Sequence, residues 1–379
     1  MRVMQVMEST LGGTRRYMED CFRALRGEPM EKAMVYATRR ADAGFLRLLD
    51  EMRADGWSTF EIDMIRSVRA GDDARAIGAA RRVFLKWRPT IVHLHSSKAG
   101  AIGRIAASTL RGIKTCYTPN SIAANIGRVY LLMERALSPL TDAYIAVTES
   151  ERNELASYGL APRRRIHTVS PSVRDDYFVP RDRRQAREYL DLPPNAAIVV
   201  GIGRLAQQKD PLGFVRVLAL LSERIPSVRG IWVGDGELRA DFERAARAAG
   251  LADTVTIAGW QEDVRLYLAA CDVFLSTAVY ESFGYVTAEA LAMRRPAVAS
   301  AIVGTIDIIT EDADFMLYPR GDFATAASKI ERFLSDTELA DAVAKRARQR
   351  VVNVFSSDAT RQALLHAYTS VSTRRTNGG

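Results

Sequence analysis

Cysteine is scarce in this sequence, with only Cys21, Cys116 and Cys271 among 379 residues. The three are far apart and none belongs to a Cys-x-x-Cys pair, so neither a disulfide framework nor a zinc ribbon is expected. Such cysteine usage favours a reducing, cytoplasmic compartment.

Long apolar runs are also missing. No stretch approaches the roughly 20 apolar residues of a membrane-spanning helix. The opening residues, "MRVMQVMEST", predict a short strand and lack the apolar core and cleavage region of a signal peptide. We therefore expect a protein that lies in the cytoplasm or on the inner face of the cell membrane and does not cross it.

The overall composition is typical of a globular protein. Hydrophobic residues make up 47% of the chain, which excludes disordered and fibrous classes. The formal net charge of +8 favours anionic partners, but charge alone does not choose among nucleic acid, an anionic membrane and a phosphorylated small molecule.

Short apolar, β-branched runs alternate with helical patterns along the whole chain, which predicts α/β architecture with doubly wound parallel sheets. There are too many strands for one ordinary sheet, and the length fits two domains. The expected strands cover residues 2–7, 33–38, 59–64, 90–95, 114–118, 143–148, 197–203, 230–234, 254–259, 272–276 and 296–300.

The polar, proline-bearing segment "SPSVRDDYFVPRDRR" predicts a domain boundary near residue 175. We expect an N-terminal domain over residues 1–175, a C-terminal domain over residues 176–354, and a helix at 355–373 that packs back on the first. The last residues, "TRRTNGG", are expected to be disordered. Ligands of parallel sheets bind beyond the carboxyl ends of the strands, so two such sheets facing each other predict a binding cleft between the domains.

The strand "AIVVGIG" is followed by "RLAQQKDPLGF". Gly201, Gly203 and Ala206 match the dinucleotide fingerprint only loosely, because the next helix is expected to begin later, with Asp210 as N-cap and Pro211 in the first turn. A nicotinamide site is therefore disfavoured.

Arg204 and Lys209 lie on this loop, at the carboxyl end of the strand. An arginine fork and a lysine charge suit a diphosphate. The alternative is two solvated surface cations, and the position at the strand end favours the functional interpretation.

The stretch "YESFGYVTAE" holds two carboxylates, Glu281 and Glu289. Gly284 is expected in the turn before a helix, so Glu281 lies on the loop and Glu289 in the helix, too far apart for a proton-sharing dyad. Separated carboxylates can accept hydrogen bonds from the hydroxyls of two different sugars. Equally, Glu289 could be a helix-surface residue and Glu281 a partner of the helix dipole.

Taken together, these motifs resemble glycosyltransferase family 4, the retaining nucleotide-sugar transferases with the GT-B fold of two Rossmann-like domains facing across a cleft. The resemblance rests on "GRLAQQKD", "WVGDGELR", "IAGWQEDVRLYLAACDVFLSTAVYESFGYVTAEALA" and "RRPAVASAIVGTIDII", which cover nearly all of residues 198–309. In the first half, "STLGGTRRY", "HLHSSKAGAIGRIAA" and "YTPNSIA" resemble bacterial enzymes that build capsules, exopolysaccharides and O-antigens.

The resemblance implies that residues 1–175 form the acceptor-binding domain and residues 176–354 the nucleotide-sugar-binding domain, and it implies roles for individual residues. Arg204 and Lys209 would bind the donor diphosphate, Glu289 the ribose hydroxyls, and Glu281 the transferred sugar; Arg204, Lys209 and Glu281 are the predicted catalytic residues. Further donor contacts are implied for Gly12, Gly13, Asn120, Gly203, Gly234, Trp260, Ser282, Phe283, Gly284, Tyr285 and Val286. The acceptor-side candidates are His95, Lys98 and Asn120.

No cofactor and no metal are expected, since enzymes of this fold generally need no metal for chemistry. His93 and His95 point to one face of a strand and could bind a metal, but a third ligand is not evident. Asp312 and Asp314 imitate the metal motif of the other major transferase fold and are interpreted as coincidence.

The chain also departs from the family pattern. Asn120 stands where members often have histidine, so it can hydrogen-bond a sugar but carries no charge. The usual glycine-containing turn before the strand "PAVAS" is Arg294-Arg295-Pro296, and Thr305 replaces a glycine. These departures leave donor-sugar identity and activity open.

The leading hypothesis is therefore a retaining transfer of sugar from a nucleotide-diphosphate donor, with uridine as the default base, to a glycan or polyprenyl-diphosphate-linked saccharide. Basic residues around "VYLLMERAL" suggest peripheral contact with anionic membrane, with ordinary solvated helix faces as the alternative. Three other hypotheses stay open: a nucleotide-sugar epimerase or a glycoside phosphorylase, a non-catalytic nucleotide-sugar or glycan-binding protein, and, last, a nucleic-acid binder, for which no recognisable module is present.

Overall fold

The computed structural model describes residues 1–8, 10, 12–120 and 127–373. Ser121 of the "YTPNSIA" motif and the tail after residue 373 lie outside this range. Contacts between residues divide the chain into two compact units. The first unit comprises residues 1–172 and 357–379, and the second comprises residues 173–356.

The first unit is built on a seven-stranded, wholly parallel sheet with the strand order β3-β2-β1-β4-β5-β6-β7. Buried Val, Met, Ile and Leu side chains fill both of its faces, as expected for strands covered on two sides. The strands are β1 (Arg2–Met7), β2 (Glu31–Tyr36), β3 (Ser58–Glu61), β4 (Ile91–His95), β5 (Lys114–Thr118), β6 (Ala143–Ala146) and β7 (Ile166–Thr168).

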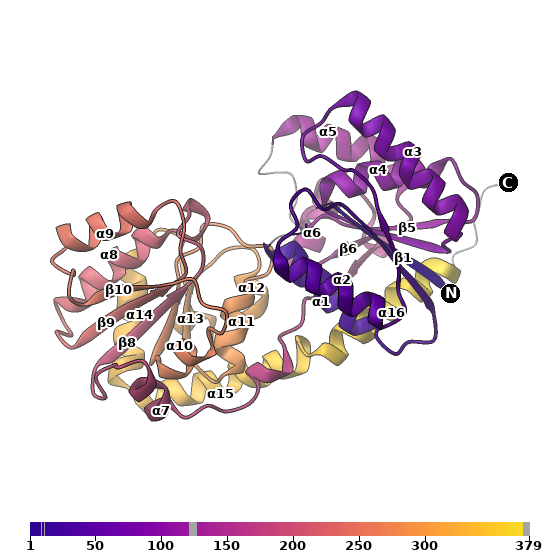
Figure 1. The fold of residues 1–379 in the computed structure, drawn as a ribbon. Helices are drawn as coiled ribbons and strands as arrows, with labels where there is room; N and C mark the ends of the chain where they lie inside the picture. Colours follow the sequence, from indigo (N-terminus) through magenta and orange to yellow (C-terminus); the bar gives the residue numbers. More distant parts are fainter. Residues whose placement is uncertain (9, 11, 121–126, 374–379) are drawn as a thin grey trace. The chain divides into compact units, whose positions relative to one another are not determined.

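Helices cover this sheet on both sides (Figure 1). They are α1 (Gly12–Leu25), α2 (Ala43–Ala54), α3 (Ala70–Trp87), α4 (Ser96–Ser108), α5 (Arg128–Leu137), α6 (Glu149–Ser157) and α16 (Ser357–Thr373).

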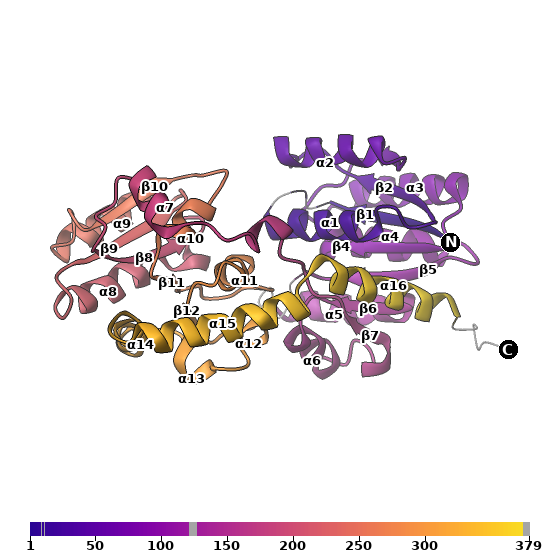
Figure 2. The same ribbon diagram turned by 90° about the horizontal axis from the view of Figure 1, so that it is seen from below.

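The C-terminal helix α16 belongs to the first unit and packs against α1 (Figure 2). Its buried Leu364, Ala367, Tyr368 and Val371 share one apolar cluster with Tyr17 of α1 and with other residues of the sheet. The first core is therefore completed by residues from the two ends of the sequence.

The second unit has a six-stranded parallel sheet with the order β10-β9-β8-β11-β12-β13. Its strands are β8 (Ala197–Ile202), β9 (Val228–Val233), β10 (Val255–Gly259), β11 (Val273–Ser276), β12 (Ala297–Ser300) and β13 (Leu317–Tyr318). Its helices are α7 (Arg183–Tyr189), α8 (Pro211–Ser222), α9 (Arg239–Ala248), α10 (Arg265–Ala270), α11 (Tyr285–Ala292), α12 (Thr305–Ile308), α13 (Ala313–Met316), α14 (Phe323–Ser335) and α15 (Thr337–Val354).

The strand order reverses direction at the same place in both sheets, between β1 and β4 in the first and between β8 and β11 in the second. In doubly wound sheets this switch point opens a crevice beyond the carboxyl ends of the strands, and ligands bind there. All eleven strands expected from the sequence are present, and the two short strands β7 and β13 were not predicted. Of the helices that the structure describes, none is long and apolar enough to span a bilayer.

Candidate functional site

In the second unit, two loops follow the strands that flank the switch point. The loop after β8 carries Arg204 and Lys209, and the loop after β11 carries Glu281. The topology therefore brings Glu281 to the loop of Arg204 and Lys209, although Lys209 and Glu281 are 72 residues apart in the sequence.

The loop after β8 ends as the sequence predicts. Asp210 is the N-cap of α8, with its carboxylate accepting from the Gly213 N–H at 3.0 Å, and Pro211 follows at the first helical position. A short 3₁₀ turn, Gln207–Lys209, separates this helix from the strand. Because no helix begins directly after Gly203, the geometry lacks the helix N-terminus that a dinucleotide fingerprint requires.

The backbone at Gly203, in the loop after β8, packs closely against the backbone at Gly234. A Cβ at Gly234, which follows β9, would lie 2.1 Å from the Gly203 carbonyl oxygen, and Gly234 has φ +134°. The Trp232 indole donates to the same carbonyl at 2.9 Å. The site therefore requires glycine at position 234, because any side chain there would push the two loops apart.

Hydrogen bonds tie the two loops together. The Thr277 hydroxyl donates to the carbonyls of Lys209 and Asp210 at 3.0 and 2.8 Å, and the Val279 N–H donates to the Gln208 carbonyl at 2.8 Å. These bonds are independent of side-chain charge, so the loops keep their spacing when a charged residue of the site is substituted.

Lys209 and Glu281 form an ion pair across the two loops. Their side chains are 23% and 14% exposed, so both still reach solvent. Arg204 is exposed, and its guanidinium makes no ion pair or hydrogen bond with any residue in the described ranges. The structure thus brings two predicted catalytic residues into contact and leaves the third open for a ligand.

The helix that follows Glu281 begins at the predicted glycine. Gly284 is the N-cap of α11, with φ +96° in the left-handed region, and Phe283 before it is buried against Tyr285 and Phe355. Glu289 lies within α11 and is 1% exposed, so it is not the helix-surface residue of the alternative interpretation. Ser282, Tyr285 and Val286 are half-buried around the same turn.

The replacement of a glycine by Thr305 is accommodated without an unpaired group. Its buried hydroxyl donates to the Ser300 carbonyl at 2.6 Å and accepts from the Ile302 N–H at 3.2 Å. The neighbouring Gly304 cannot be replaced as easily, since a Cβ there would lie 2.6 Å from the Phe283 carbonyl oxygen.

Trp260 is placed apart from this group. It follows β10, the outer strand of the sheet, and is 74% exposed. Asp312 is the N-cap residue of α13, and Arg346 binds its carboxylate at 2.8 and 2.7 Å, which gives the Asp312 and Asp314 motif a structural explanation.

The other predicted residues lie in the first unit, near the carboxyl ends of β1, β4 and β5. Gly12 and Gly13 are exposed and begin α1, and Asn120 follows β5 in the left-handed conformation. Lys98, on α4, is largely buried and forms an ion pair with Asp73 of α3 at 2.6 Å. Sequence reasoning did not find Asp73, because nothing in its local pattern marks it as a partner.

His95 ends β4 and is fully buried in a hydrogen-bonded network. Gln5 donates from Nε2 to the Tyr368 hydroxyl at 2.9 Å, so its Oε1 faces His95 Nε2 at 2.7 Å and that nitrogen carries the proton. Both ring nitrogens of His93 are engaged, by the Tyr368 hydroxyl and by Thr118, each at 2.8 Å. Burial lowers the pKa of His95 to about 3, and burial together with His95 lowers the pKa of His93 well below its usual value.

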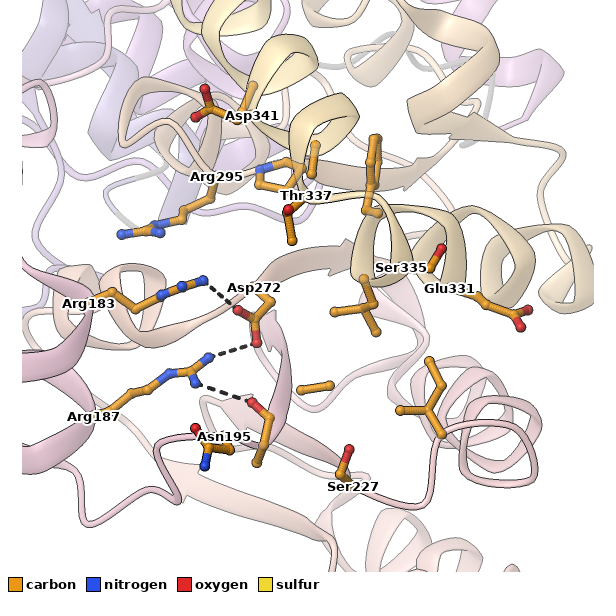
Figure 3. A pocket seen from close by; sticks show the side chains of 18 of the residues that line it. Arg183, Arg187, Asn195, Ser227, Asp272, Arg295, Glu331, Ser335, Thr337 and Asp341 are labelled. Carbon is orange, nitrogen blue, oxygen red and sulfur yellow. Dashed lines mark hydrogen bonds and ion pairs between the residues drawn. The ribbon is translucent and has the colours of Figure 1, made fainter.

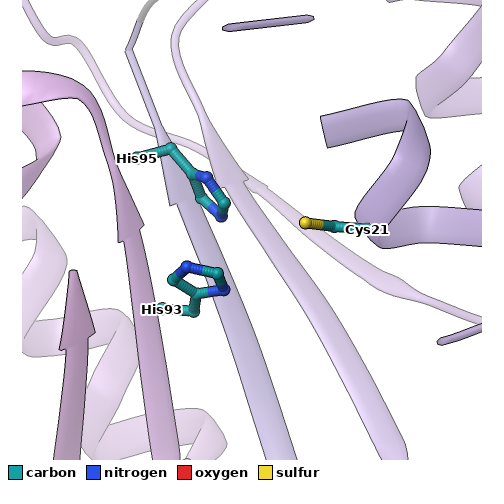
Figure 4. Close-up of side chains that lie close together, drawn as sticks. All are labelled: Cys21, His93 and His95. Atoms are coloured by element: carbon teal, nitrogen blue, oxygen red, sulfur yellow. The ribbon is translucent and has the colours of Figure 1, made fainter. Parts of the chain in front are cut away.

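Cys21 of α1 supplies the third potential metal ligand that the sequence did not reveal (Figure 4). One ligand atom each from Cys21, His93 and His95 lies within 4.8 Å of the others, and all three residues are buried. Burial raises the pKa of the Cys21 thiol well above its usual value. A metal would have to displace a hydrogen bond of His93, because of the four ring nitrogens only His95 Nδ1 lacks a partner.

Two family models match the chain in succession. The model described as Glycosyltransferase Family 4 matches residues 11–177, and the model described as Glycosyl transferases group 1 matches residues 182–350. The chain belongs to glycosyltransferase family 4. It is therefore an enzyme, and the resemblance drawn from its motifs is confirmed.

Curated relatives of this glycosyltransferase include a D-inositol 3-phosphate glycosyltransferase of Actinosynnema mirum, which is 30% identical over 73% of this chain and 72% of the relative. The lipopolysaccharide core biosynthesis glycosyltransferase LpsE of Rhizobium meliloti is 29% identical over 61% of this chain, and the match spans 65% of LpsE. A UDP-Gal:alpha-D-GlcNAc-diphosphoundecaprenol alpha-1,3-galactosyltransferase of Escherichia coli is 25% identical over 77% of this chain and 78% of its own length.

Solved structures confirm the predicted fold class, GT-B with two Rossmann-like parallel-sheet units. Anabaena HepE in complex with UDP has a TM-score of 0.82 at 20% identity and covers 98% of the glycosyltransferase and 100% of HepE. The sucrose-phosphate synthase of Thermosynechococcus elongatus has a TM-score of 0.80 at 20% identity, with 98% of each chain covered.

Proposed function

We propose that this glycosyltransferase moves a sugar, with retention, from a nucleotide-diphosphate donor to a glycan or polyprenyl-diphosphate-linked saccharide in bacterial surface polysaccharide synthesis. The observation that carries the proposal is the contact of Lys209 with Glu281 at the switch point; Arg204, on the same loop as Lys209, leaves its guanidinium open. A UDP-sugar is the expected donor, which is supported by the UDP-galactose donor named for the Escherichia coli relative and by the UDP bound to HepE.

Arg204 and Lys209 would hold the donor diphosphate. A bound diphosphate competes with Glu281 for the Lys209 ammonium. Arg204 and Lys209 together then balance the negative charge of the diphosphate. Glu281 is then free to accept hydrogen bonds from the transferred sugar, and the buried Glu289 would accept from the ribose hydroxyls.

The main chemical task of these residues is electrostatic. When the sugar leaves the diphosphate, negative charge grows on the phosphate oxygens, and cations already in position stabilise it without reorganising. We propose a front-face route in which the acceptor hydroxyl arrives on the side of the departing diphosphate and gives its proton to a phosphate oxygen. No metal cofactor is proposed for this step.

The first unit offers space for the acceptor. A cavity of about 590 Å³ lies between α3, α4 and α5, and apolar Ile102 and Ile105 line it beside three cations. Two of these cations, Lys98 and Arg40, form ion pairs with Asp73 and Glu8 of the same lining, and the third is Arg66. Cations next to apolar side chains suit a lipid diphosphate, whose head group is anionic and whose tail is apolar. We place the protein in the cytoplasm, at the inner face of the cell membrane.

The proposed function is tested by donor binding followed by transfer. In a thermal-shift panel of nucleotide sugars, the true donor raises the melting temperature in proportion to the logarithm of its concentration. With that donor, an added glycan or lipid-linked acceptor is expected to accelerate release of the nucleotide diphosphate, equally in EDTA. Donor binding without such release with any acceptor would favour a non-catalytic binding protein, and an epimerised donor would favour an epimerase.

We also propose that α5 rests on anionic lipid. None of its residues is buried, and Val129, Leu132 and Met133 expose 69%, 62% and 38% of their surface on one face of the helix. Replacing Val129 and Leu132 by Gln is expected to abolish sedimentation with phosphatidylglycerol liposomes. Leu46→Gln, at a leucine of α2 that is 49% exposed, is the control. Equal sedimentation with phosphatidylcholine liposomes would exclude the idea.

A further inference from the structure

A second polar pocket lies at the opposite edge of the second sheet, where the strands begin (Figure 3). Its cavity has a volume of about 860 Å³ and is lined by residues that precede β8, β9, β11 and β12, together with residues of α7, α14 and α15. The proposed donor site lies at the carboxyl ends of these strands, so the two sites lie at opposite ends of the strands of one sheet.

The arginines of this pocket outnumber the carboxylates available to them. Asp272 binds Arg183 through Oδ1 and Arg187 through Oδ2, each at 2.7 Å, and it also accepts from the Ile198 N–H at 2.8 Å. All three of these bonds go to groups other than Arg295.

The remaining acids of the lining are also engaged. Asp341 forms an ion pair with Arg294 at 2.6 Å, and Glu331 forms one with Arg224 at 2.7 Å. No carboxylate of the pocket is left for another cation.

Arg295 is the cation without a partner. Its guanidinium has no ion pair or hydrogen bond with any residue that the structure describes, and its buried Nε is unsatisfied. Burial lowers the pKa of Arg295; nearby Cys271 and Asp272 oppose this shift, whereas the like charges of Arg183 and Arg187 add to it. A half-buried, uncompensated arginine beside two others is costly unless an anion joins them.

The backbone at Arg294 is in an unfavourable, left-handed conformation. Arg294 has φ +58° at the end of α11, with its N–H bonded to the Leu291 carbonyl and the Arg295 N–H bonded to the Ala290 carbonyl. Glycine adopts this conformation most easily, yet the chain keeps two consecutive arginines there.

We propose that this pocket binds a phosphate-bearing small molecule, with Arg295 as its main ligand and Arg183 beside it. A phosphate accepts bidentate hydrogen bonds from a guanidinium and matches its planar fork. Figure 3 shows the three arginines on one side of the pocket and Ser335 on the other, and Asn195, Ser227 and Thr337 also line it. These polar side chains can hydrogen-bond the hydroxyl groups of a phosphorylated polyol.

The test uses the full chain and inorganic phosphate and pyrophosphate as probes, titrated calorimetrically at constant ionic strength in chloride. Arg295→Gln is expected to weaken binding at this pocket about 10- to 100-fold, the range for a lost charge-assisted hydrogen bond. Arg247→Gln is the matched control, because Arg247 is exposed on α9 outside the lining of this pocket, and it should leave phosphate affinity unchanged.

Lys209→Ala separates this pocket from the donor site. If phosphate binding is kept in Lys209→Ala and lost in Arg295→Gln, the proposal holds. If binding is lost in Lys209→Ala and kept in Arg295→Gln, phosphate enters only the donor site and the proposal is wrong. Thermal unfolding without phosphate checks that Arg295→Gln is folded, and its melting temperature should not fall, since the substitution removes an uncompensated charge.

Discussion

Lys209→Ala is expected to lower the rate of sugar transfer about 10²- to 10³-fold, the usual loss when one preorganised group that stabilises developing charge is removed. Lys209 is the cation closest to Glu281, and its side chain crosses Gly203, where an added Cβ would lie 3.0 Å from its Cγ. The fold should survive, because the loops on either side are joined through backbone carbonyls and Thr277. Turnover in single-turnover and steady-state assays, with circular dichroism of each variant, measures the effect.

Lys345→Ala is the matched control, since it makes the same substitution at an exposed position of α15. Arg204→Ala should reproduce the loss of turnover without changing the Lys209 and Glu281 contact. Near-normal turnover in folded Lys209→Ala would contradict the proposed role. A large fall in melting temperature with normal turnover would instead make Lys209 a structural partner of Glu281.

Acid is expected to destabilise the first unit through His93 and His95. Both imidazoles are neutral in the folded state, because burial lowers their pKa values, to about 3 for His95, whereas an unfolded histidine titrates near 6.5. Above pH 6.5 neither state takes up a proton, so stability is unchanged. As the pH falls from 6.5 toward 3, only the unfolded state is protonated, and stability falls by about 1.4 kcal/mol per pH unit for each histidine.

Urea unfolding at pH 7 and pH 5 measures this loss. His95→Gln removes one titrating group and should flatten the pH dependence of the free energy of unfolding, even if it lowers stability at pH 7. His366→Gln is the control for the loss of an imidazole outside the buried network, because His366 is exposed on α16. An unchanged slope in His95→Gln would show that the acid sensitivity comes from other groups.

Much of the second unit could be predicted from the sequence, because its local signals agree with its packing. Asp210 and Pro211 give a helix start that depends only on neighbouring residues, and the strands of four or more residues were all recognised. The strands β7 and β13 have three and two residues, too few to show a periodic pattern. These two strands form because they pair with the neighbouring strands β6 and β12 at the outer side of each sheet.

Contacts between distant segments could not be predicted in the same way. Cys21 lies beside His93 and His95 only because α1 packs over the carboxyl half of β4, and neither segment encodes that packing locally. Likewise, the sequence marks Arg294-Arg295 as unusual, but the lack of a partner for Arg295 is visible only once Asp272, Asp341 and Glu331 are placed.

The position of α16 constrains how the protein is made. Residues 357–373 supply part of the apolar interior of the first unit, so that interior can close only after these residues have left the ribosome. The usual vectorial order, in which the earliest domain folds first, is unavailable to this unit. The second unit, which is continuous from 173 to 356, is then the part that can fold while the nascent chain still grows.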